Sequence, residues 1–492
     1  MNDMNWVAVY PEILLLVLAC VVAMVDLFVT DPRRTPTYWL TQLSLGVVAA
    51  MHFAAIGDAP VIAMQSMLKI DSLSHLITGV SCIAVMITLV YSRPYAESRD
   101  MLKGELFTLS MLSLLGVAVM VASNNFLMIY LGLELMSLSL YALTALRRDH
   151  TLSTEAAMKY FVLGALASGF LLYGLSMMYG ATGSLSIPRV MEVIETGVPN
   201  KSVLVLGVVF VVAGLGFKLG AAPFHMWVPD VYQGAPTAAT LLIGGAPKLA
   251  AVGMTLRLLV EGMIGLANDW QQMMLVMAVA SLVVGNLAAI AQSNLKRMLA
   301  YSTIAQMGFV VLGLASGVVN GERDHALNAY SSAMFYSITY VLTTLGSFGL
   351  IMLLARQGFE SENINDLAGL FKRSPWYALV MAIYMFSLAG IPPTVGFYGK
   401  LAVLQAMVTT GQSLYIGLAV AAVVLSLVGA FYYLRVVKVM FFDEPTDHSP
   451  LVAPADARLV MSINGIAVLV FGLLPGGLLT LCGEALTRAL AR

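Results

Sequence analysis

The stretch GLGFKLGAAPFHMWVPD (214–230) decides the fold class of this sequence. It is an apolar run that contains a lysine and is interrupted by glycine and proline. A second stretch, FSLAGIPPTVGFYGK (386–400), has the same character. Irregular backbone at membrane depth survives only where protein or water satisfies the freed carbonyl groups, so such broken helices tend to line ion routes. A proline kink that serves packing alone is the alternative interpretation of each stretch.

Apolar segments also fill most of the chain around these two stretches. Of the 492 residues, 59% are hydrophobic and only 11% are charged, against about 25% charged residues in soluble domains. The apolar runs are continuous rather than alternating, which excludes a transmembrane β-barrel. A net charge of −1 leaves no basic surface for nucleic acid. The sequence therefore predicts an all-α polytopic membrane protein.

The number of spans follows from the roughly 20 apolar residues that a helix needs to cross a bilayer. Cutting the apolar runs at proline, glycine and charged clusters predicts about 14 spans. The predicted spans are 7–29, 37–57, 71–92, 105–122, 125–146, 155–180, 202–220, 236–260, 270–292, 297–318, 326–355, 376–409, 412–441 and 457–483. No segment between them is long enough for a soluble domain, so any chemistry must lie within the membrane.

The distribution of basic residues predicts the topology, because cytoplasmic loops collect lysine and arginine. Loops after odd-numbered spans carry fifteen basic residues, and the opposite side carries seven. We therefore expect both termini on the non-cytoplasmic side.

Five ionisable residues fall inside the predicted spans: Glu134, Lys159, Lys218, Lys248 and Lys400. An unpaired charge at mid-bilayer costs about 2.5 to 3.5 kcal/mol even on the mildest scale, so such residues are rare and usually functional. Glu134 and Lys248 stand about 15 to 18 Å of helix rise into their spans, near the membrane midplane. Snorkelling or static ion pairing is the alternative, and it applies most to Lys159, which is only four residues past Glu155.

Two similar short sequences predict an internal repeat. The sequence AAMKY (156–160) in span six resembles SAMFY (332–336) in span eleven, and each lies one span before an interrupted span. Spans four to eight and nine to thirteen are therefore predicted to be two five-helix repeats, inverted because the number of spans is odd, as in ion-coupled transporters. The predicted regions are 1–103 with spans one to three, 104–262 with the first repeat, 263–442 with the second repeat, and 443–492 with the C-terminal loop and span 14.

Cysteine and histidine usage argues against redox chemistry within this chain. Cys20, Cys82 and Cys482 lie far apart in apolar runs, so neither a metal cluster nor a disulfide framework is expected. The six histidines show no paired spacing within one helix that would suggest haem ligation. No glycine-rich phosphate loop follows a strand. We expect no cofactor and no metal in this chain.

Four motifs give the chain a resemblance to a known family. They are YFVLGALASGFLLYGLSMMYGATGS (160–184), GFKLGAAPFHMWVPDVYQGAPT (216–237), NLKRMLAYSTIAQMGF (294–309) and SLAGIPPTVGFYGKL (387–401). They resemble the antiporter-like subunit N (subunit 2) family of bacterial proton-pumping NADH:quinone oxidoreductase, respiratory complex I. The resemblance runs from about Leu106 to Tyr433. The related subunit M usually has a glutamate where this chain has Lys400, and subunit L has a trailing lateral helix that this chain lacks.

The resemblance implies roles for the ionisable residues within the spans. Glu134 on span five would pair with Lys218 on span seven. Lys248 on span eight would be the central proton site. Lys400 on span twelve would pass the proton to the outer side.

Two further residues receive roles from the resemblance. His225, just past the first interruption, would bridge Lys218 towards Lys248, although a packed or interfacial histidine is the alternative. Lys159 would lie near the half-channel through which protons arrive.

The resemblance also implies partners and a location. The chain would be a proton-translocating subunit in the bacterial inner membrane, coupled to quinone reduction elsewhere in the complex. FMN, iron-sulfur clusters and quinone would belong to partner subunits, with subunits M and K as neighbours, subunit L in contact through its lateral helix, and membrane lipid around the chain. Two alternatives stay open: a subunit of an Mrp-type cation/proton antiporter, and a structural subunit whose lysines only form buried pairs.

Overall fold

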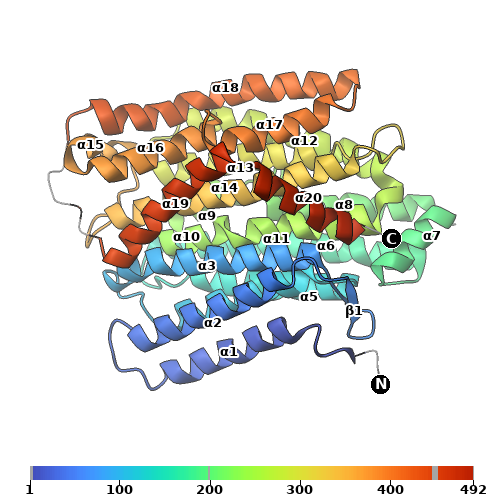
Figure 1. Cartoon of the computed structure of the whole chain (residues 1–492), viewed down its shortest axis with the longest axis horizontal. Coiled ribbons are helices and arrows are strands. Elements are labelled where there is room, and N and C mark those ends of the chain that lie inside the picture. The colour runs from blue at the N-terminus through green and yellow to red at the C-terminus, as the bar shows by residue number, and fades with distance from the viewer. Residues whose placement is uncertain (1–3, 198–199, 446–450, 452, 491–492) are drawn as a thin grey trace.

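A computed structural model describes residues 4–197, 200–445, 451 and 453–490. Long helices run side by side along one axis of the molecule (Figure 1). Within the described residues, eleven helices are long and apolar enough to cross a membrane. The helices α1 and α2 and the shorter apolar helices α16 and α17 run along the same axis, which agrees with the expected all-α polytopic architecture.

The N-terminal region packs three helices and a small β-hairpin. Its elements are α1 (Tyr10–Asp26), α2 (Thr35–Ala54), β1 (Val61–Ala63), β2 (Leu68–Ile70) and α3 (Ser72–Glu97). The two strands pair antiparallel with Val61 opposite Ile70, and this hairpin was not expected from the sequence. It marks one end of the bundle, called here the hairpin end (Figure 1). Asp71 starts α3 through a capping box with Ser74, which satisfies two backbone N–H groups.

The predicted first repeat contains nine helical segments within residues 104–262. They are α4 (Gly104–Val121), α5 (Phe126–Thr144), α6 (Thr151–Thr182), α7 (Ile187–Thr196), α8 (Lys201–Leu219), α9 (Trp227–Gly234), α10 (Thr237–Gly244), α11 (Ala246–Thr255) and the π-helical segment η2 (Leu256–Gly262). The short 3₁₀ turn η3 (Ile264–Leu266) leads into the second repeat.

The predicted second repeat lies above the first in the view of Figure 1. Its elements are α12 (Ala267–Ile290), α13 (Leu295–Leu314), α14 (Ala326–Leu354), the 3₁₀ turn η4 (Ile364–Leu367), α15 (Leu370–Arg373), α16 (Pro375–Ala389), α17 (Val395–Val408) and α18 (Ser413–Phe442). Residues 355–369, called here the strap, connect α14 to α15 at the end of the bundle opposite the hairpin. This opposite end is called the strap end.

The two interruptions predicted from the sequence are confirmed. The first separates α8 from α9 and begins at Gly220, and the second separates α16 from α17 and begins at Gly390. Both glycines have a left-handed backbone, with φ of +77° and +83°, a conformation that costs residues with a Cβ atom free energy. Each break therefore ends its first half-helix abruptly and frees the last carbonyl groups of that half-helix.

Two predicted spans differ from the continuous helices that were expected. Span eight is divided at Gly245 into α10 and α11 and ends in η2, because Pro247 in the first turn of α11 restricts the backbone before it. Span fourteen consists of α19 (Ala455–Leu473) and α20 (Gly476–Leu490), which meet next to Pro475. Part of the expected loop before α19, residues 446–450 and 452, lies outside the described residues.

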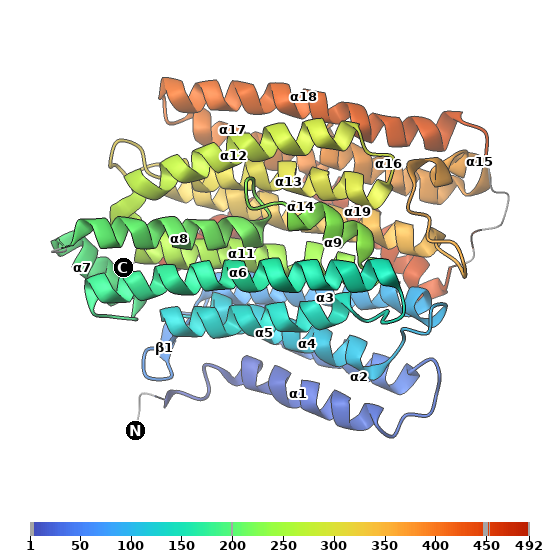
Figure 2. The same cartoon turned by 180° about the vertical axis from the view of Figure 1, so that it is seen from behind.

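Burial distinguishes a central helix from peripheral ones. The most apolar part of the segment Thr237–Gly262 is wholly buried inside the chain, whereas that of α18 is only 22% buried. The helices α6, α8 and α12 lie on the face seen in Figure 2, and α19 and α20 cross the face seen in Figure 1. The segment Thr237–Gly262, which carries Lys248, therefore lies at the centre of the bundle.

Candidate functional site

The ammonium group of Lys248 caps the first helix break. Lys248 is 1% exposed and stands on α11, three residues past Gly245. Its Nζ donates to the carbonyl oxygens of Lys218 at 3.3 Å and of Leu219 at 2.9 Å, the last two residues of α8. The negative end of a helix dipole favours a positive charge at this position. Lys218 and Lys248 are thus joined through the backbone of the break.

The ammonium group of Lys400 caps the second break in the same way. Lys400 is 8% exposed and stands on α17. Its Nζ donates to the carbonyl oxygens of Leu388 and Ala389 at 3.0 Å each, the last two residues of α16, and to Ser426 Oγ at 2.8 Å. Both breaks therefore use a buried lysine from another segment to satisfy two freed carbonyl groups.

The surroundings of these two lysines are also alike. Lys248 Nζ lies 5.2 Å from the ring centre of Trp227, and Lys400 Nζ lies 5.2 Å from that of Phe309. None of the ion pairs of the described residues involves either lysine. Each ammonium is held only by neutral oxygens and an aromatic ring. Without a carboxylate partner, burial disfavours the charged form, so such a lysine can release a proton.

Lys218 meets Ser137 rather than Glu134. Its Nζ donates to Ser137 Oγ at 2.9 Å, and both Ser137 and Glu134 stand on α5, three residues apart. Glu134 Oε1 is buried and has no hydrogen-bond partner among the described residues. The direct Glu134–Lys218 pair is thus not formed in this conformation. Ser137 was not identified from the sequence.

His225 lies in the loop of the first break and has no direct contact with either lysine among the described hydrogen bonds. Its Nδ1 is buried without a partner, while the adjacent Met226 is exposed. Lys248 reaches the end of α8 directly. A bridging role for His225 would therefore need a water molecule or a movement of the loop.

Lys159 takes part in a network of charged residues towards the strap end. Its Nζ lies 2.8 Å from both Glu155 and Asp230, and Arg297 lies 2.8 Å from Asp230. Lys159 and Asp230 are 42% and 35% exposed. This partly exposed position agrees with the snorkelling alternative. Asp230 and Arg297 were not singled out, although both belong to motifs quoted from the sequence.

A buried charge cluster at the hairpin end was not expected from the sequence, since Arg257 and Lys69 are two of the seven basic residues assigned above to the non-cytoplasmic side. Arg257 and Asp71 are 0% exposed and form two hydrogen bonds, at 2.7 and 2.9 Å. Arg257 also contacts Glu261 at 2.5 Å, and Lys69 lies 3.3 Å from Glu261. The spacing of Arg257 and Glu261, four residues apart in one helical segment, is the signal that could have revealed the cluster.

A histidine pair also forms between neighbouring helices. His52 on α2 and His75 on α3 are buried, and their Nδ1 atoms lie 3.0 Å apart. One ring therefore donates and the other accepts. The spacing of histidines within one helix cannot reveal this contact, because the two rings come from different helices.

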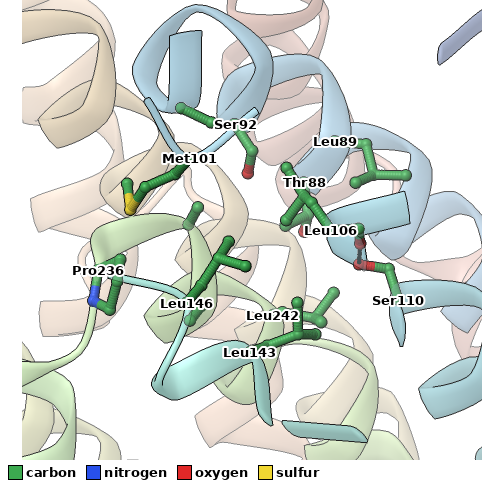
Figure 3. Close-up of a pocket in the computed structure, with 13 residues that line it drawn as sticks. Thr88, Leu89, Ser92, Met101, Leu106, Ser110, Leu143, Leu146, Pro236 and Leu242 are labelled. Atoms are coloured by element: carbon green, nitrogen blue, oxygen red, sulfur yellow. Dashed lines mark hydrogen bonds between the residues drawn. The ribbon is translucent and has the colours of Figure 1, made fainter. Parts of the chain in front are cut away.

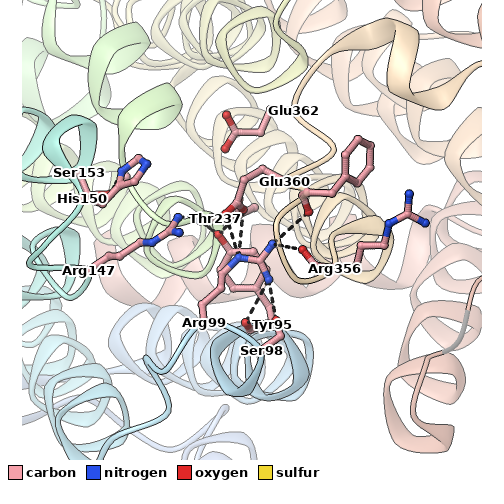
Figure 4. A network of polar contacts seen from close by, with 12 residues as sticks. Tyr95, Ser98, Arg99, Arg147, His150, Ser153, Thr237, Arg356, Glu360 and Glu362 are labelled. Atoms are coloured by element: carbon pink, nitrogen blue, oxygen red, sulfur yellow. Dashed lines mark hydrogen bonds and ion pairs between the residues drawn. The ribbon is translucent and has the colours of Figure 1, made fainter. Parts of the chain in front are cut away.

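A polar network at the strap end joins three regions of the chain (Figure 4). Glu360 in the strap accepts hydrogen bonds from Arg99 at 2.9 and 3.1 Å, from Arg147 at 3.0 Å and from Tyr95 at 3.0 Å. The backbone N–H of Thr237, the first residue of α10, donates to Tyr95 Oη at 3.2 Å. Burial raises the pKa of Glu360, but the hydrogen bonds and charge of Arg99 outweigh it, so the pKa lies below its ordinary value.

A small cavity lies between α3, α4, α5 and α10 (Figure 3), and its lining includes Ala96 and Pro236, the sequence neighbours of Tyr95 and Thr237 in this network. Its volume of about 10 Å³ is close to the minimum for one water molecule. The hydroxyl of Ser92 is buried there without a partner, while Thr88 and Ser110 donate to carbonyls of their own helices. The cavity therefore offers the hydroxyl of Ser92 as a polar contact next to the start of α10.

α3 consequently contacts both ends of the segment Thr237–Gly262, which carries Lys248. At the strap end Tyr95 contacts Thr237, and at the hairpin end Asp71 contacts Arg257. The lysine itself lies between these two anchors. The N-terminal region thus positions the central site.

Comparisons with known proteins agree with these features. The family described as "NADH:quinone oxidoreductase/Mrp antiporter, TM" matches residues 123–426. A relative from Polaromonas naphthalenivorans, named NADH-quinone oxidoreductase subunit N, is 62% identical and covers 99% of this chain and 98% of its own length. A relative of the same name from Herminiimonas arsenicoxydans is 58% identical over 100% of both chains.

Solved structures show the same fold. A chain of respiratory complex I from Thermus thermophilus with bound aureothin is 31% identical, with a TM-score of 0.82 over 96% of this chain and 100% of that chain. A chain of an Mrp complex from a Dietzia species has a TM-score of 0.85 at 20% identity, over 98% of this chain and 97% of that chain, and shares the fold alone. The chain therefore belongs to the NADH:quinone oxidoreductase/Mrp antiporter family and, within it, to the subunit N group of NADH-quinone oxidoreductase.

Proposed function

We propose that this chain moves protons across the membrane as a membrane-arm subunit of NADH:quinone oxidoreductase, driven by quinone reduction elsewhere in the complex. The observation that carries the proposal is the pair of helix breaks, each capped by a buried lysine that has only neutral partners. A buried amine in such a place changes its charge when its surroundings change. The fold shared with respiratory complex I supports the assignment.

In this proposal Glu134 controls the proton on Lys218. When the carboxylate approaches the ammonium, Lys218 holds its proton, and when it withdraws, the proton passes to Lys248. A pair at about 4 Å and an effective dielectric of about 20 interacts by about 4 kcal/mol. Moving one charge against 100 mV costs about 2.3 kcal/mol. The electrostatic switch is therefore strong enough for the task.

Lys400 would then pass the proton towards the hairpin end, which we place on the non-cytoplasmic side together with both termini. Lys159, in the charge network towards the strap end, would attract protons at the cytoplasmic side. His225 would take part in the transfer only through water or a loop movement. The excess of basic residues on the loops assigned to the cytoplasm supports this orientation in the bacterial inner membrane.

The redox groups belong to partner subunits in this proposal, with FMN, iron-sulfur clusters and quinone outside this chain. Subunits M and K would be its membrane neighbours, and subunit L would contact it through a lateral helix. The exposed apolar surface of α18 and α6 supports contacts with other membrane subunits and lipid.

Replacing the central lysine tests the proposal. Lys248→Met should abolish most NADH-driven proton uptake into inverted vesicles while the complex still assembles. Normal uptake per NADH oxidised in assembled Lys248→Met complex would refute the role of Lys248. An Mrp-type antiporter is the alternative suggested by the shared fold, and it predicts cation/proton exchange by the chain's assembly without NADH or quinone.

A further inference from the structure

Gln306 belongs to the motif NLKRMLAYSTIAQMGF (294–309). The lysine sites described above give this motif no role. Gln306 stands on α13, is 2% exposed, and faces the second helix break. Its Nε2 donates to the carbonyl oxygen of Leu388 at 2.8 Å and to Tyr433 Oη at 2.9 Å. Its Oε1 accepts from Tyr336 Oη. All three contacts are consistent with one orientation of the amide.

The carbonyl group of Leu388 is therefore shared by two donors. It accepts from Gln306 at 2.8 Å and from Lys400 at 3.0 Å. A carbonyl oxygen has two lone pairs, so it accommodates both. Among the described contacts, the other carbonyl held by Lys400, that of Ala389, has no second donor.

We propose that Gln306 is a positioning residue that allows Lys400 to give up its proton. The inference rests on the proposed function, in which Lys400 releases a proton towards the hairpin end. Gln306 keeps the carbonyl of Leu388 hydrogen-bonded when Lys400 no longer does so.

The number of donors explains this role. The charged –NH₃⁺ group has three N–H donors, and Lys400 uses them on Leu388, Ala389 and Ser426. When one N–H bond breaks and the proton leaves to water on the outer side, the –NH₂ group keeps two donors and a lone pair. One of the three acceptors must then lose its donor from Lys400, and a buried carbonyl that has no other donor costs as much as a lost hydrogen bond. Because Gln306 remains bound to Leu388, this carbonyl can be released without that cost.

The first break lacks an equivalent of Gln306. The carbonyls of Lys218 and Leu219 accept from Lys248, with no second side-chain donor among the described contacts. The neutral –NH₂ form of Lys248 keeps two N–H donors, which are enough for these two carbonyls. Lys400 has a third acceptor in Ser426, and at its break one of the carbonyls also has a second side-chain donor, Gln306.

Few other titratable groups face this site. Tyr336 from α14 and Tyr433 from α18 contact Gln306, and Tyr433 also contacts Ser302 on α13 at 2.5 Å. The segments α16 and α17 contribute the carbonyls and Lys400 itself. No described ion pair joins a carboxylate or histidine to Lys400. Lys400 is therefore the group with a titratable amine that a change at Gln306 affects most directly, through the carbonyl of Leu388.

The test compares Gln306→Met, which keeps the size of the side chain and removes its donors, with wild type in the assembled complex. Removing the second donor raises the free energy of the neutral form of Lys400. Lys400 should therefore release its proton only at a higher pH. The acid limb of the pH profile of NADH-driven pumping should move up by about one pH unit, equal to about a tenfold loss at a fixed pH on that limb. Gln306→His, which keeps an N–H donor, should restore most of the wild-type profile.

A matched control removes a similar hydrogen bond elsewhere. Gln42 on α2 donates to the carbonyl oxygen of Met86 at 3.1 Å, and Gln42→Met should leave the profile unchanged. A wild-type profile in Gln306→Met, or lower pumping without a shift of the acid limb, would overturn the inference. The variant Lys400→Ala separates the role of Gln306 from the proposed function. Normal pumping in Lys400→Ala would refute the proton-release role of Lys400 and with it the role of Gln306. An inactive Lys400→Ala together with a normal Gln306→Met would refute only the role of Gln306.

Discussion

The Nζ atom of Lys248 lies 2.9 Å from the carbonyl oxygen of Leu219, the residue that follows Lys218. The central lysine is thus bound to the end of the helix that carries its neighbour in the proposed proton chain. A shift of the end of α8 would move the acceptor of Lys248 as well as the ammonium of Lys218. In the proposed mechanism, this contact would couple charge transfer to movement of the break.

Gly220→Ala should lower proton pumping by disturbing this contact. The glycine has φ of +77°, and a Cβ atom there would lie 3.2 Å from Lys248 Nζ and 3.0 Å from Val228. The left-handed backbone alone costs about 1 to 2 kcal/mol for other residues. NADH-driven acidification of inverted vesicles measures the effect. Gly180→Ala on α6, with no atom within 4 Å of its Cβ position, is the control and should be fully active.

Ser137→Ala should reduce pumping several-fold, because Lys218 loses its hydrogen-bond partner. Ser137→Thr keeps the hydroxyl and should be milder. Glu134→Gln should act in the same direction by removing the charge that attracts Lys218. Coupled turnover of the single and double variants gives a double-mutant cycle, and strictly additive losses would contradict a shared action on Lys218.

Three substitutions at Lys400 distinguish a titratable group from a fixed charge. Lys400→Arg keeps the charge but cannot release a proton at working pH, so it should impair pumping nearly as much as Lys400→Ala. Lys400→Glu should retain more activity, since it can bind and release a proton. The measurement is vesicle acidification at matched assembly levels. Full activity of Lys400→Arg would show that Lys400 serves only as a fixed charge.

Arg257→Met should destabilise the chain by about 3 to 5 kcal/mol, because Asp71 and Glu261 would stay buried without their partner. Replacing Asp71 by Asn in the same chain should recover part of the loss. Thermal unfolding of the purified complex and its yield on native gels report the effect. Arg189→Met is the control, since its pair with Glu192 is exposed and such pairs contribute little. Equal stability of both variants would contradict the structural role of the cluster.

Acid should release the strap through Glu360. The pKa of its carboxyl lies below the ordinary value in the folded chain, so the charged form stabilises the strap above the unfolded pKa of about 4.3. This stabilisation is lost as the pH falls through the lower folded value. Limited proteolysis of the strap between pH 7 and 3 should show protection that declines below about pH 4. Glu360→Gln should be cleaved faster at pH 7, and a steep pH dependence in that variant would contradict the assignment.

The sequence by itself determined the membrane class and the position of both breaks. These properties are local: a run of about 20 apolar residues must cross a bilayer, and closely spaced proline and glycine within such a run weaken the helix there. The in-span lysines were also identifiable, because charge at membrane depth is rare. The resemblance to the subunit N family, carried by four motifs, is confirmed by the relatives.

Only the tertiary structure decided which atoms these residues meet. Lys218 donates to Ser137 rather than to Glu134, and Arg257, one of the basic residues assigned to the non-cytoplasmic side, is fully buried against Asp71. Gln306 reaches the carbonyl of Leu388 across 82 positions of the chain. Such contacts depend on the rotation and vertical offset of neighbouring helices, and a shift of one residue turns a side chain by about 100° around its helix. Local sequence patterns specify that a helix exists, whereas packing over the whole bundle sets this register and with it the hydrogen-bond partners of each lysine.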